Sequence, residues 1–344
     1  MKHGTTTIAF FVAIAATPSM AQEVTLKIAD SLPADHIITH NTTDVFMERV
    51  KEELGDRVAF EHYPAQQLAK AKDMLAITQA GIADIGYIVP SYVSEKMPLG
   101  GVVELPGEIS SSCEGTLAFR NLVQPGGVLD ELEFQPNGVR VLYNVALSPY
   151  QAFFSKRAEV KSLEDFDGMK MRSNPGAMEL SLQSVGAAPI RMTPPEIFDA
   201  MSKGTIDGAL LPYTSIFSYG LNQITGSSTE NANFGTVGIT YAISENKWNS
   251  LPEDIQEVLT RIGQQVTESA CSAFDEAEKT LAAELSEKGA TVFELTEEES
   301  TVLNDSFESV AQDWAKRLDS RGKKGSEILS IFREQVETLR AEGT

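Results

Sequence analysis

Hydrophobic and polar residues alternate in two rhythms over the first third of the chain. Residues 24–30 carry apolar side chains at every second position, which is typical of a β-strand. Residues 41–54 carry them at intervals of three and four, which predicts a helix that ends before a glycine. A strand, a helix and a third strand follow at 57–63, 71–81 and 83–90. The order β-α-β-α-β is typical of a doubly wound α/β domain.

The same alternation of strands and helices returns in the middle of the chain. Its strands are predicted at 139–156, 170–172, 188–192 and 205–213, and its helices at 175–186 and 193–204. The second of these strands ends in Arg172. Because open α/β sheets bind ligands at the carboxyl ends of their strands, Arg172 is the first candidate for a ligand contact.

The last third of the chain is mainly helical, and one of its helices is unusually long. A capping box of Ser250 and Glu253 opens a helical pattern of about 37 residues, which corresponds to about 55 Å. A helix of this length either forms a coiled coil or crosses from one domain to another. Polar residues occupy many positions that a heptad core would need, so we favour the crossing helix.

The N-terminus and the net charge restrict where the protein works and what it binds. Residues 1–21 combine a cation at Lys2, an apolar run and small residues before Gln22, the pattern of a cleaved secretory signal peptide. We therefore expect the mature protein in the periplasm. The chain has 344 residues and a formal net charge of −21, which argues against a nucleic-acid partner because a phosphate backbone attracts basic surfaces.

Few residues suit covalent or metal chemistry. The sequence contains no common hydrolase, nucleotide-binding or zinc-protease motif, so we expect no catalytic residue, no cofactor and no metal. His36 and His40 have the i, i+4 spacing of a metal pair, but hydrogen bonding in a loop explains them as well. Cys113 and Cys271 either form one disulfide in an oxidising compartment or are two small buried residues in separate helices, and both alternatives stay open.

Two α/β domains, export and the missing catalytic machinery together favour a particular class of protein. A hinged binding protein that closes on a small solute has these properties. Because ligand pockets favour domain interfaces, we expect the site in the cleft between the two domains.

The central stretch of the chain resembles the signature of the TRAP-transporter solute-binding proteins of the dicarboxylate-binding type. In that family a strand with Gly, Lys and Arg precedes a Gly-Ala-x-Pro turn, a helix led by glutamate and an Asp-Gly strand. The matching residues here are Gly168, Lys170, Arg172, Gly186, Ala187, Pro189, Glu196, Asp207 and Gly208. Flanking stretches are similar to the family as well, so the resemblance covers nearly the whole mature chain.

The resemblance implies a type II-like periplasmic binding protein of the TRAP subtype. Its two α/β domains would enclose a hinge cleft, share a strand and be spanned by one long helix. The expected parts are the signal peptide at 1–21, domain I at 22–147 plus about 238–276, and domain II at 148–237 plus about 277–344. The resemblance also implies that Arg172 holds a substrate carboxylate in a two-pronged salt bridge, since a guanidinium fork matches two carboxylate oxygens. A structural ion pair with a nearby Asp or Glu is the alternative.

Two departures from the family pattern make the expected pocket less polar. Tyr150 stands where many relatives carry a second arginine, and Leu211 stands where they carry a polar residue before a proline. Further aromatic residues, Tyr92 among them, lie near strand ends that face the expected cleft, although each suits a core position as well. The candidate ligand-binding residues are Arg172, Tyr150, Asn174, Tyr213, Tyr87, His36, Phe153 and Phe234.

The expected function is that of an extracytoplasmic solute receptor, which delivers a small organic acid to the TRAP membrane permease. The pocket composition predicts a monocarboxylate with an apolar or aromatic body. A cationic ligand surrounded by tyrosines is an alternative, because cation–π contacts would hold it. An exported ligand-sensing protein and an exported α/β enzyme are the other hypotheses. We expect the protein to be a monomer.

Overall fold

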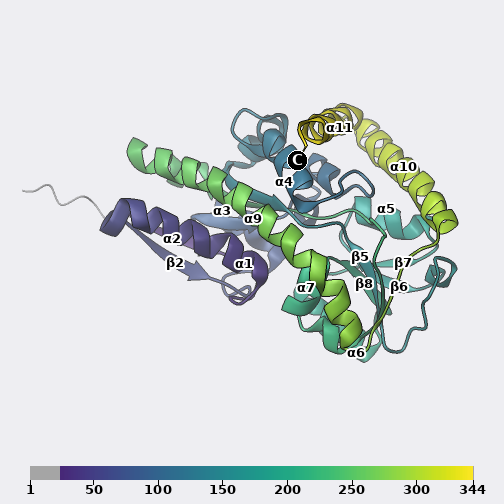
Figure 1. The fold of residues 1–344 in the computed structure, drawn as a ribbon. Helices are drawn as coiled ribbons and strands as arrows, with labels where there is room; N and C mark the ends of the chain where they lie inside the picture. Colours follow the sequence, from purple (N-terminus) through teal and green to yellow (C-terminus); the bar gives the residue numbers. More distant parts are fainter. Residues whose placement is uncertain (1–23, 344) are drawn as a thin grey trace, which may run out of the picture.

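The computed structural model describes residues 24–343, in which two β-sheets with flanking helices form the two halves of the molecule (Figure 1). The expected α/β class is therefore confirmed. The predicted signal peptide at 1–21 lies outside the described residues. No helix in the described range is long and apolar enough to span a membrane.

The first sheet has five strands in the order β2-β1-β3-β10-β4. They are β1 (Val24–Ala29), β2 (Val58–Tyr63), β3 (Ile85–Ile88), β4 (Val139–Ala146) and β10 (Gly238–Ser244). β1 pairs in parallel with β2 and β3, as expected where strands alternate with helices, whereas β10 runs antiparallel to β3 and β4. β3 is buried at every position, which explains why its sequence is apolar on both faces.

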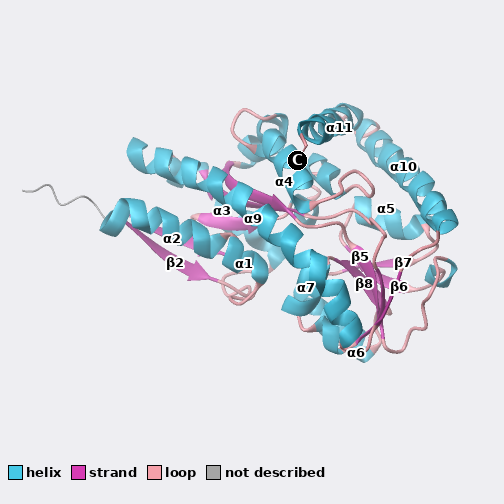
Figure 2. Ribbon diagram, viewed as in Figure 1, coloured by secondary structure: helices cyan, strands magenta, loops and turns pink. Residues whose placement is uncertain are grey.

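The second sheet has six strands in the order β11-β9-β5-β8-β6-β7, drawn in magenta with the first sheet in Figure 2. They are β5 (Gln151–Ser155), β6 (Lys170–Ser173), β7 (Ala188–Arg191), β8 (Gly208–Leu211), β9 (Thr225–Thr229) and β11 (Thr291–Phe293). β6 lies between β7 and β8 and is parallel to both. The strand that carries Arg172 is thus an interior strand, as its sequence position predicts.

The chain passes three times between the two sheets, twice through short connections and once through residues 245–290, which lead from β10 to β11 (Thr291–Phe293). Residues 147–150 connect β4 to β5, and residues 230–237 connect β9 to β10. The resemblance implies one strand shared by both domains, but the structure divides the run at 139–156 into two strands of different sheets. Pro149 lies at the break, where its missing N–H prevents a continuous ladder. Two short connections of this kind are suited to a hinge between the halves.

Helices cover both sheets. They are α1 (Ile37–Asn41), α2 (Thr43–Leu54), α3 (Met74–Gln79), α4 (Ser112–Val123), α5 (Ala177–Ser184), α6 (Ile197–Lys203), α7 (Tyr213–Ser218), α8 (Glu245–Trp248), α9 (Glu253–Glu287), α10 (Glu297–Asp319) and α11 (Gly325–Glu342). Two 3₁₀ segments, η3 (Pro90–Val93) and η4 (Leu99–Glu104), follow β3 and carry part of the site. The predicted helices at 71–81 and 193–204 each begin with a 3₁₀ turn before α3 and α6.

α9 is a single helix of 35 residues, about 52 Å long. It packs against α2, α4 and β4 in the first half and against α7 and β11 in the second. Figure 1 shows it running diagonally across both halves. The prediction of a helix that crosses between the two domains is therefore confirmed.

Two acidic residues, one turn apart on α9, cap helices of different halves. Asp275 accepts hydrogen bonds from the first two backbone N–H groups of α4, at 2.6 and 3.0 Å. Glu278 accepts hydrogen bonds from the first two backbone N–H groups of α7, at 3.1 and 2.8 Å. A carboxylate at a helix N-terminus satisfies free N–H groups and complements the helix dipole. α9 therefore anchors one helix of each half through its side chains.

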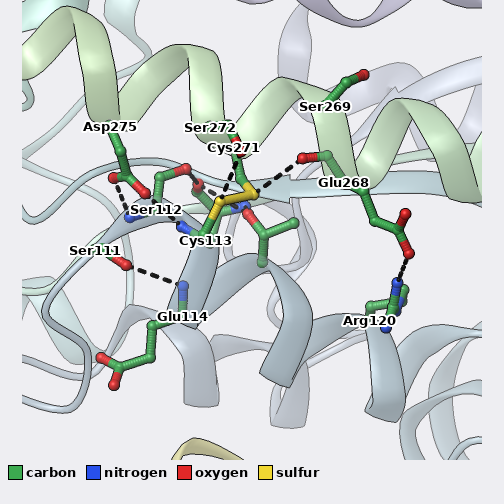
Figure 3. Close-up of a disulfide and its surroundings, with 12 residues drawn as sticks. Ser111, Ser112, Cys113, Glu114, Arg120, Glu268, Ser269, Cys271, Ser272 and Asp275 are labelled. Carbon is green, nitrogen blue, oxygen red and sulfur yellow. Dashed lines mark hydrogen bonds and ion pairs between the residues drawn. A yellow bond between two sulfur atoms is a disulfide. The ribbon is translucent and has the colours of Figure 1, made fainter. Parts of the chain in front are cut away.

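A disulfide between Cys113 and Cys271 fastens α9 to α4, with 4.7 Å between the two Cα atoms (Figure 3). The structure thus decides between the two alternatives that the sequence leaves open. Figure 3 also shows Asp275 one turn further along α9, pointing at the start of α4 beside the sulfur atoms. The covalent bond and the capping carboxylate hold the same two helices together.

The C-terminal helices contact both halves of the molecule. α10 packs against α5, and α11 packs against α4. Phe332 and Val336 of α11 share a core with Phe119 and Leu122 of α4. The division of the chain into two domains at about 147, 237 and 276 stays a prediction.

Candidate ligand-binding site

Arg172 lies near the end of β6 and is completely buried. Neighbouring strands supply neutral oxygen acceptors for its guanidinium group. Nε donates a hydrogen bond to the carbonyl of Met192 at 3.0 Å, and Nη1 donates to the carbonyl of Leu210 at 3.3 Å. Nη2 donates to the side-chain oxygen of Asn174. These contacts orient the guanidinium plane without neutralising its charge.

Within residues 24–343, Arg172 is the one lysine or arginine that is buried, and it forms no ion pair with a carboxylate of those residues. An unpaired buried charge is costly, often by several kcal/mol. The structure therefore gives no support to the alternative of a structural ion pair. A buried, unpaired positive charge of this kind is suited to an anionic ligand.

Tyrosines surround the guanidinium group. Burial raises the pKa of Tyr150 and Tyr219 well above the usual value, and the positive charge of Arg172 lowers it in part. Burial raises the pKa of Tyr92 as well. The charge of Arg172 lowers this pKa in part, Glu104 raises it, and hydrogen bonding with Arg172 and Tyr87 lowers it. All these phenols are therefore neutral near pH 7. They present flat apolar faces together with O–H donors to whatever Arg172 binds.

His36 supplies a neutral donor from the first half. Its Nδ1 accepts the backbone N–H of Ile38 at 3.1 Å, which caps α1, and its ring lies 4.9 Å from the ring of Tyr219. Burial lowers the pKa of His36 to about 3, so the ring is neutral. Because Nδ1 is an acceptor, the proton resides on Nε2, which has no hydrogen-bond partner in the described part of the chain.

Asp30, which directly follows β1, lies on the same side of the cluster as His36. One of its carboxylate oxygens accepts the hydroxyl of Tyr241 at 2.6 Å, and the other accepts the backbone N–H of Leu32 at 2.9 Å. The charge of Asp30 contributes to the raised pKa of Tyr87 and of Tyr219. A carboxylate at this place repels a second anionic group of a ligand.

Glu104 lies on the Arg172 side of the cluster, at the end of η4, and is 1% exposed. Its two carboxyl oxygens have no hydrogen-bond partner among the described residues. Burial raises the pKa of Glu104 to about 8, while Ser91, the charge of Arg172 and Asn174 each act to lower it. This carboxyl group is therefore mostly protonated at neutral pH.

A cavity of about 560 Å³ opens beside this cluster, between the two halves. Tyr92 and Asn174, which lie beside Arg172, are two of its lining residues. The remaining lining residues are Gln66, Lys70, Lys72, Pro175, Arg191, Met192, Thr193, Pro195 and Glu196. Its three cations are exposed at the mouth, and Arg191 there forms an ion pair with Glu179. The cavity has the size of a small-molecule site, and its cations favour the entry of anions.

Comparison with known proteins agrees with this geometry. The family model for bacterial extracellular solute-binding proteins of family 7, DctP, matches residues 28–317. The chain belongs to this family. Its members bind solutes and are not enzymes, which confirms the interpretation as a binding protein.

Relatives of known structure share the whole fold. A TRAP solute-binding protein from a marine metagenome, solved with 3-hydroxybenzoate, has a TM-score of 0.85 at 24% identity and covers 92% of this chain and 99% of its own. A TRAP solute-binding protein of Rhodoferax ferrireducens T118, solved with benzoate, has a TM-score of 0.84 at 25% identity, with coverages of 93% and 100%.

A relative matched by sequence is the C4-dicarboxylate-binding periplasmic protein DctP of Rhodobacter capsulatus. It is 26% identical over 88% of this chain and 89% of its own.

Five of the predicted site residues of this family 7 protein lie together. They are Arg172, Asn174, Tyr150, Tyr87 and His36, which the hydrogen bonds, ring contacts and pKa shifts above connect to one another. His36 does not form a metal pair with His40, which instead contacts Asp44 at 2.9 Å. Among the described residues no cluster of His, Cys, Asp and Glu is suited to a metal ion.

The other three predicted residues have contacts in the protein core. Phe153 packs edge-on against Tyr213 at 4.9 Å, and the Tyr213 hydroxyl donates to the carbonyl of Thr229 at 2.7 Å. Phe234 stacks on Phe166 at 5.7 Å. No contact of the described residues supports a ligand role for these three, and that role stays a prediction.

Sequence reasoning missed Glu104, Ser91 and Tyr219. Glu104 had a signal, because it is a lone acid within the apolar run from Val102 to Leu105. Such a residue is rarely buried without a function or a partner. Tyr219 had no such signal, since it follows an ordinary short helix and reaches the site through the packing of α7.

Proposed function

We propose that this solute receptor of the TRAP type captures a monocarboxylate with an aromatic body and delivers it to a membrane permease. The carboxylate would lie on the Arg172 fork, and the aromatic body would lie between the tyrosine rings. The neutral Nε2–H of His36 would donate to a polar substituent on the far side. This assignment joins the predicted residues Arg172 and His36 to a set of tyrosines that includes Tyr219, which sequence reasoning missed.

One observation carries the proposal, namely that the described part of the chain buries a single lysine or arginine. A dicarboxylate would bring a second negative charge into the same cleft. Asp30 and Glu104 are the buried acids that face the tyrosine cluster, and neither would compensate that charge. An uncompensated buried carboxylate is very unfavourable, so a monocarboxylate suits the site better.

The relatives support an aromatic acid more than a dicarboxylate. Two structural relatives, with TM-scores of 0.85 and 0.84, were solved with 3-hydroxybenzoate and benzoate. The Rhodobacter capsulatus relative is a C4-dicarboxylate-binding protein at similar identity. With one carboxylate on Arg172, the second carboxylate of such a ligand has only exposed cations among the residues that line the cavity, namely Lys70, Lys72 and Arg191.

The remaining parts of the proposal concern the setting in which the protein works. We propose export through a cleaved signal peptide at 1–21, action in the periplasm as a monomer, and hinge closure around the ligand. The two short connections between the sheets and the anchors on α9 support the hinge. Loss of uptake of the bound acid on deletion of a TRAP permease would distinguish transport from ligand sensing.

Calorimetry with the purified protein tests the proposal. We expect benzoate and 3-hydroxybenzoate to bind more tightly than succinate. The variant Arg172→Lys keeps the charge but loses the fork, which should weaken binding by about 2–5 kcal/mol, roughly 30-fold or more. Arg120→Lys on α4 is the matched control, because Arg120 pairs with Glu268 outside the cavity, and it should change affinity less than threefold. Tightest binding of succinate, or an Arg172→Lys variant that binds like the wild type, would overturn the proposal.

A further inference from the structure

Glu104 has no role in the fold that its contacts explain. It is buried, and its carboxyl oxygens lack hydrogen-bond partners in the described range. The side-chain nitrogen of Asn174 and the hydroxyl of Ser91 lie close enough to Glu104 to lower its pKa as hydrogen-bonding groups. Both are buried, and neither forms a hydrogen bond of ordinary geometry with Glu104 or with another described residue. Buried polar groups are almost always hydrogen-bonded, so several free ones in one place indicate a site that a ligand completes.

The charges around Glu104 affect whether its carboxyl group is neutral or ionised when an acidic ligand binds. Arg172 faces it from β6, and the neutral phenols of Tyr92 and Tyr150 face it from η3 and from the connection between the sheets. A ligand carboxylate on Arg172 would place two carboxyl groups beside one cation. Two carboxylates that share a site do not both stay ionised, since their repulsion raises the pKa of one of them.

We propose that Glu104 contacts the bound acid as a neutral carboxylic acid and donates its O–H to a carboxylate oxygen of the ligand. The inference rests on the proposed function, because it requires a ligand carboxylate on Arg172. When Glu104 is ionised in the free protein, it takes one proton from solvent as the ligand binds. Glu104 thereby selects ligands that offer an acceptor beside Arg172 and disfavours ligands that offer an ammonium group there.

The pKa of about 8 in the unliganded protein sets the pH range of the effect. Below pH 7 Glu104 is already neutral, and affinity should be constant. Above pH 8 binding must first protonate it, so benzoate should bind about tenfold more weakly at pH 9 than at pH 7, with an uptake of about 0.9 proton per ligand at pH 9. The site tyrosines stay neutral over this range, because burial raises their pKa values.

The experiment is calorimetry with benzoate at pH 7, 8 and 9 in buffers of different ionisation enthalpy. Glu104→Gln is permanently neutral and keeps a donor, so its affinity should not change with pH. Glu133→Gln is the matched control. Glu133 is also buried, its pKa is raised to about 7, and it accepts the backbone N–H groups of Leu99 and Gly100. This variant should keep the tenfold change of the wild type.

The outcomes separate this inference from the proposed function. Benzoate affinity that depends on Arg172 but is constant from pH 7 to 9, with no proton uptake, would overturn the role of Glu104 alone. Loss of the pH dependence in Glu133→Gln would overturn it as well. Absence of benzoate binding to the wild type at pH 7 would overturn both. Proton uptake is measured on the wild type, so the test does not depend on folding of the Glu104→Gln variant.

Discussion

Replacing Cys113 and Cys271 by alanine should destabilise the protein without weakening ligand binding. The disulfide joins α4 to α9, and no residue of these helices belongs to the cluster around Arg172. In the folded protein the two helices stay together without the bond, because Asp275 caps α4 and apolar side chains pack between them. The bond therefore acts mainly on the unfolded chain.

The size of the effect follows from the length of the loop that the bond closes. The two cysteines are separated by 158 residues along the chain. The chain-entropy relation gives about 5 kcal/mol at 25 °C for a loop of this length, and losses of native disulfides commonly reach about 2–5 kcal/mol. We therefore expect a loss within that range. It should appear as a lower urea midpoint, since denaturant unfolding reports the free energy of unfolding.

Urea unfolding of the wild type with and without reductant, beside the double alanine variant, measures this loss. Reductant should lower the midpoint of the wild type to that of the variant and leave the variant unchanged. Benzoate affinity of all samples should agree within threefold. Equal midpoints for the oxidised and reduced wild type would refute the reasoning on the unfolded chain. A larger loss of affinity would refute the separation of the bond from the site.

Further predictions concern pH, helix capping and domain closure. The pKa of His36 is about 3 in the folded protein and 6.5 in the unfolded chain. Below pH 6.5 the unfolded chain therefore binds a proton that the folded protein does not bind, and the free energy of unfolding falls by about 3 kcal/mol at pH 4. His36→Asn keeps a cap acceptor, and its urea midpoint should change less between pH 6.5 and 4 than that of the wild type. Glu278→Gln removes a charged cap of α7 and should lower stability by about 1–2 kcal/mol in urea unfolding, whereas an unchanged midpoint would contradict the anchoring role. Small-angle scattering should give a smaller radius of gyration with benzoate than without it, and an equal radius would contradict hinge closure.

Much of the fold is readable from the sequence because it depends on local periodicity. Alternating apolar residues place β1 and β2, and a run that is apolar on both faces places β3, within a few positions of their observed bounds. The long helical pattern predicts α9 and its crossing role, but the expected capping box of Ser250 and Glu253 is wrong. The residue before the first turn is Pro252, which has no side-chain cap, and the Ser250 hydroxyl donates to the carbonyl of Lys247 instead. The position of Arg172 at the end of a short interior strand likewise follows from the strand pattern and from where such sheets bind ligands.

The remaining features depend on which distant segments meet. Alternation along β5 predicts that Phe153 and Phe154 face opposite sides, but only the packed structure shows that the former meets Tyr213 and the latter meets Phe166. The disulfide is a further case, because sequence gives no distance between two helices. Local pattern reports whether a side chain is buried, whereas the partner of a buried group is set by the tertiary packing. For this reason Arg172 was visible in the sequence, and Glu104 became part of the site only when the two halves were brought together.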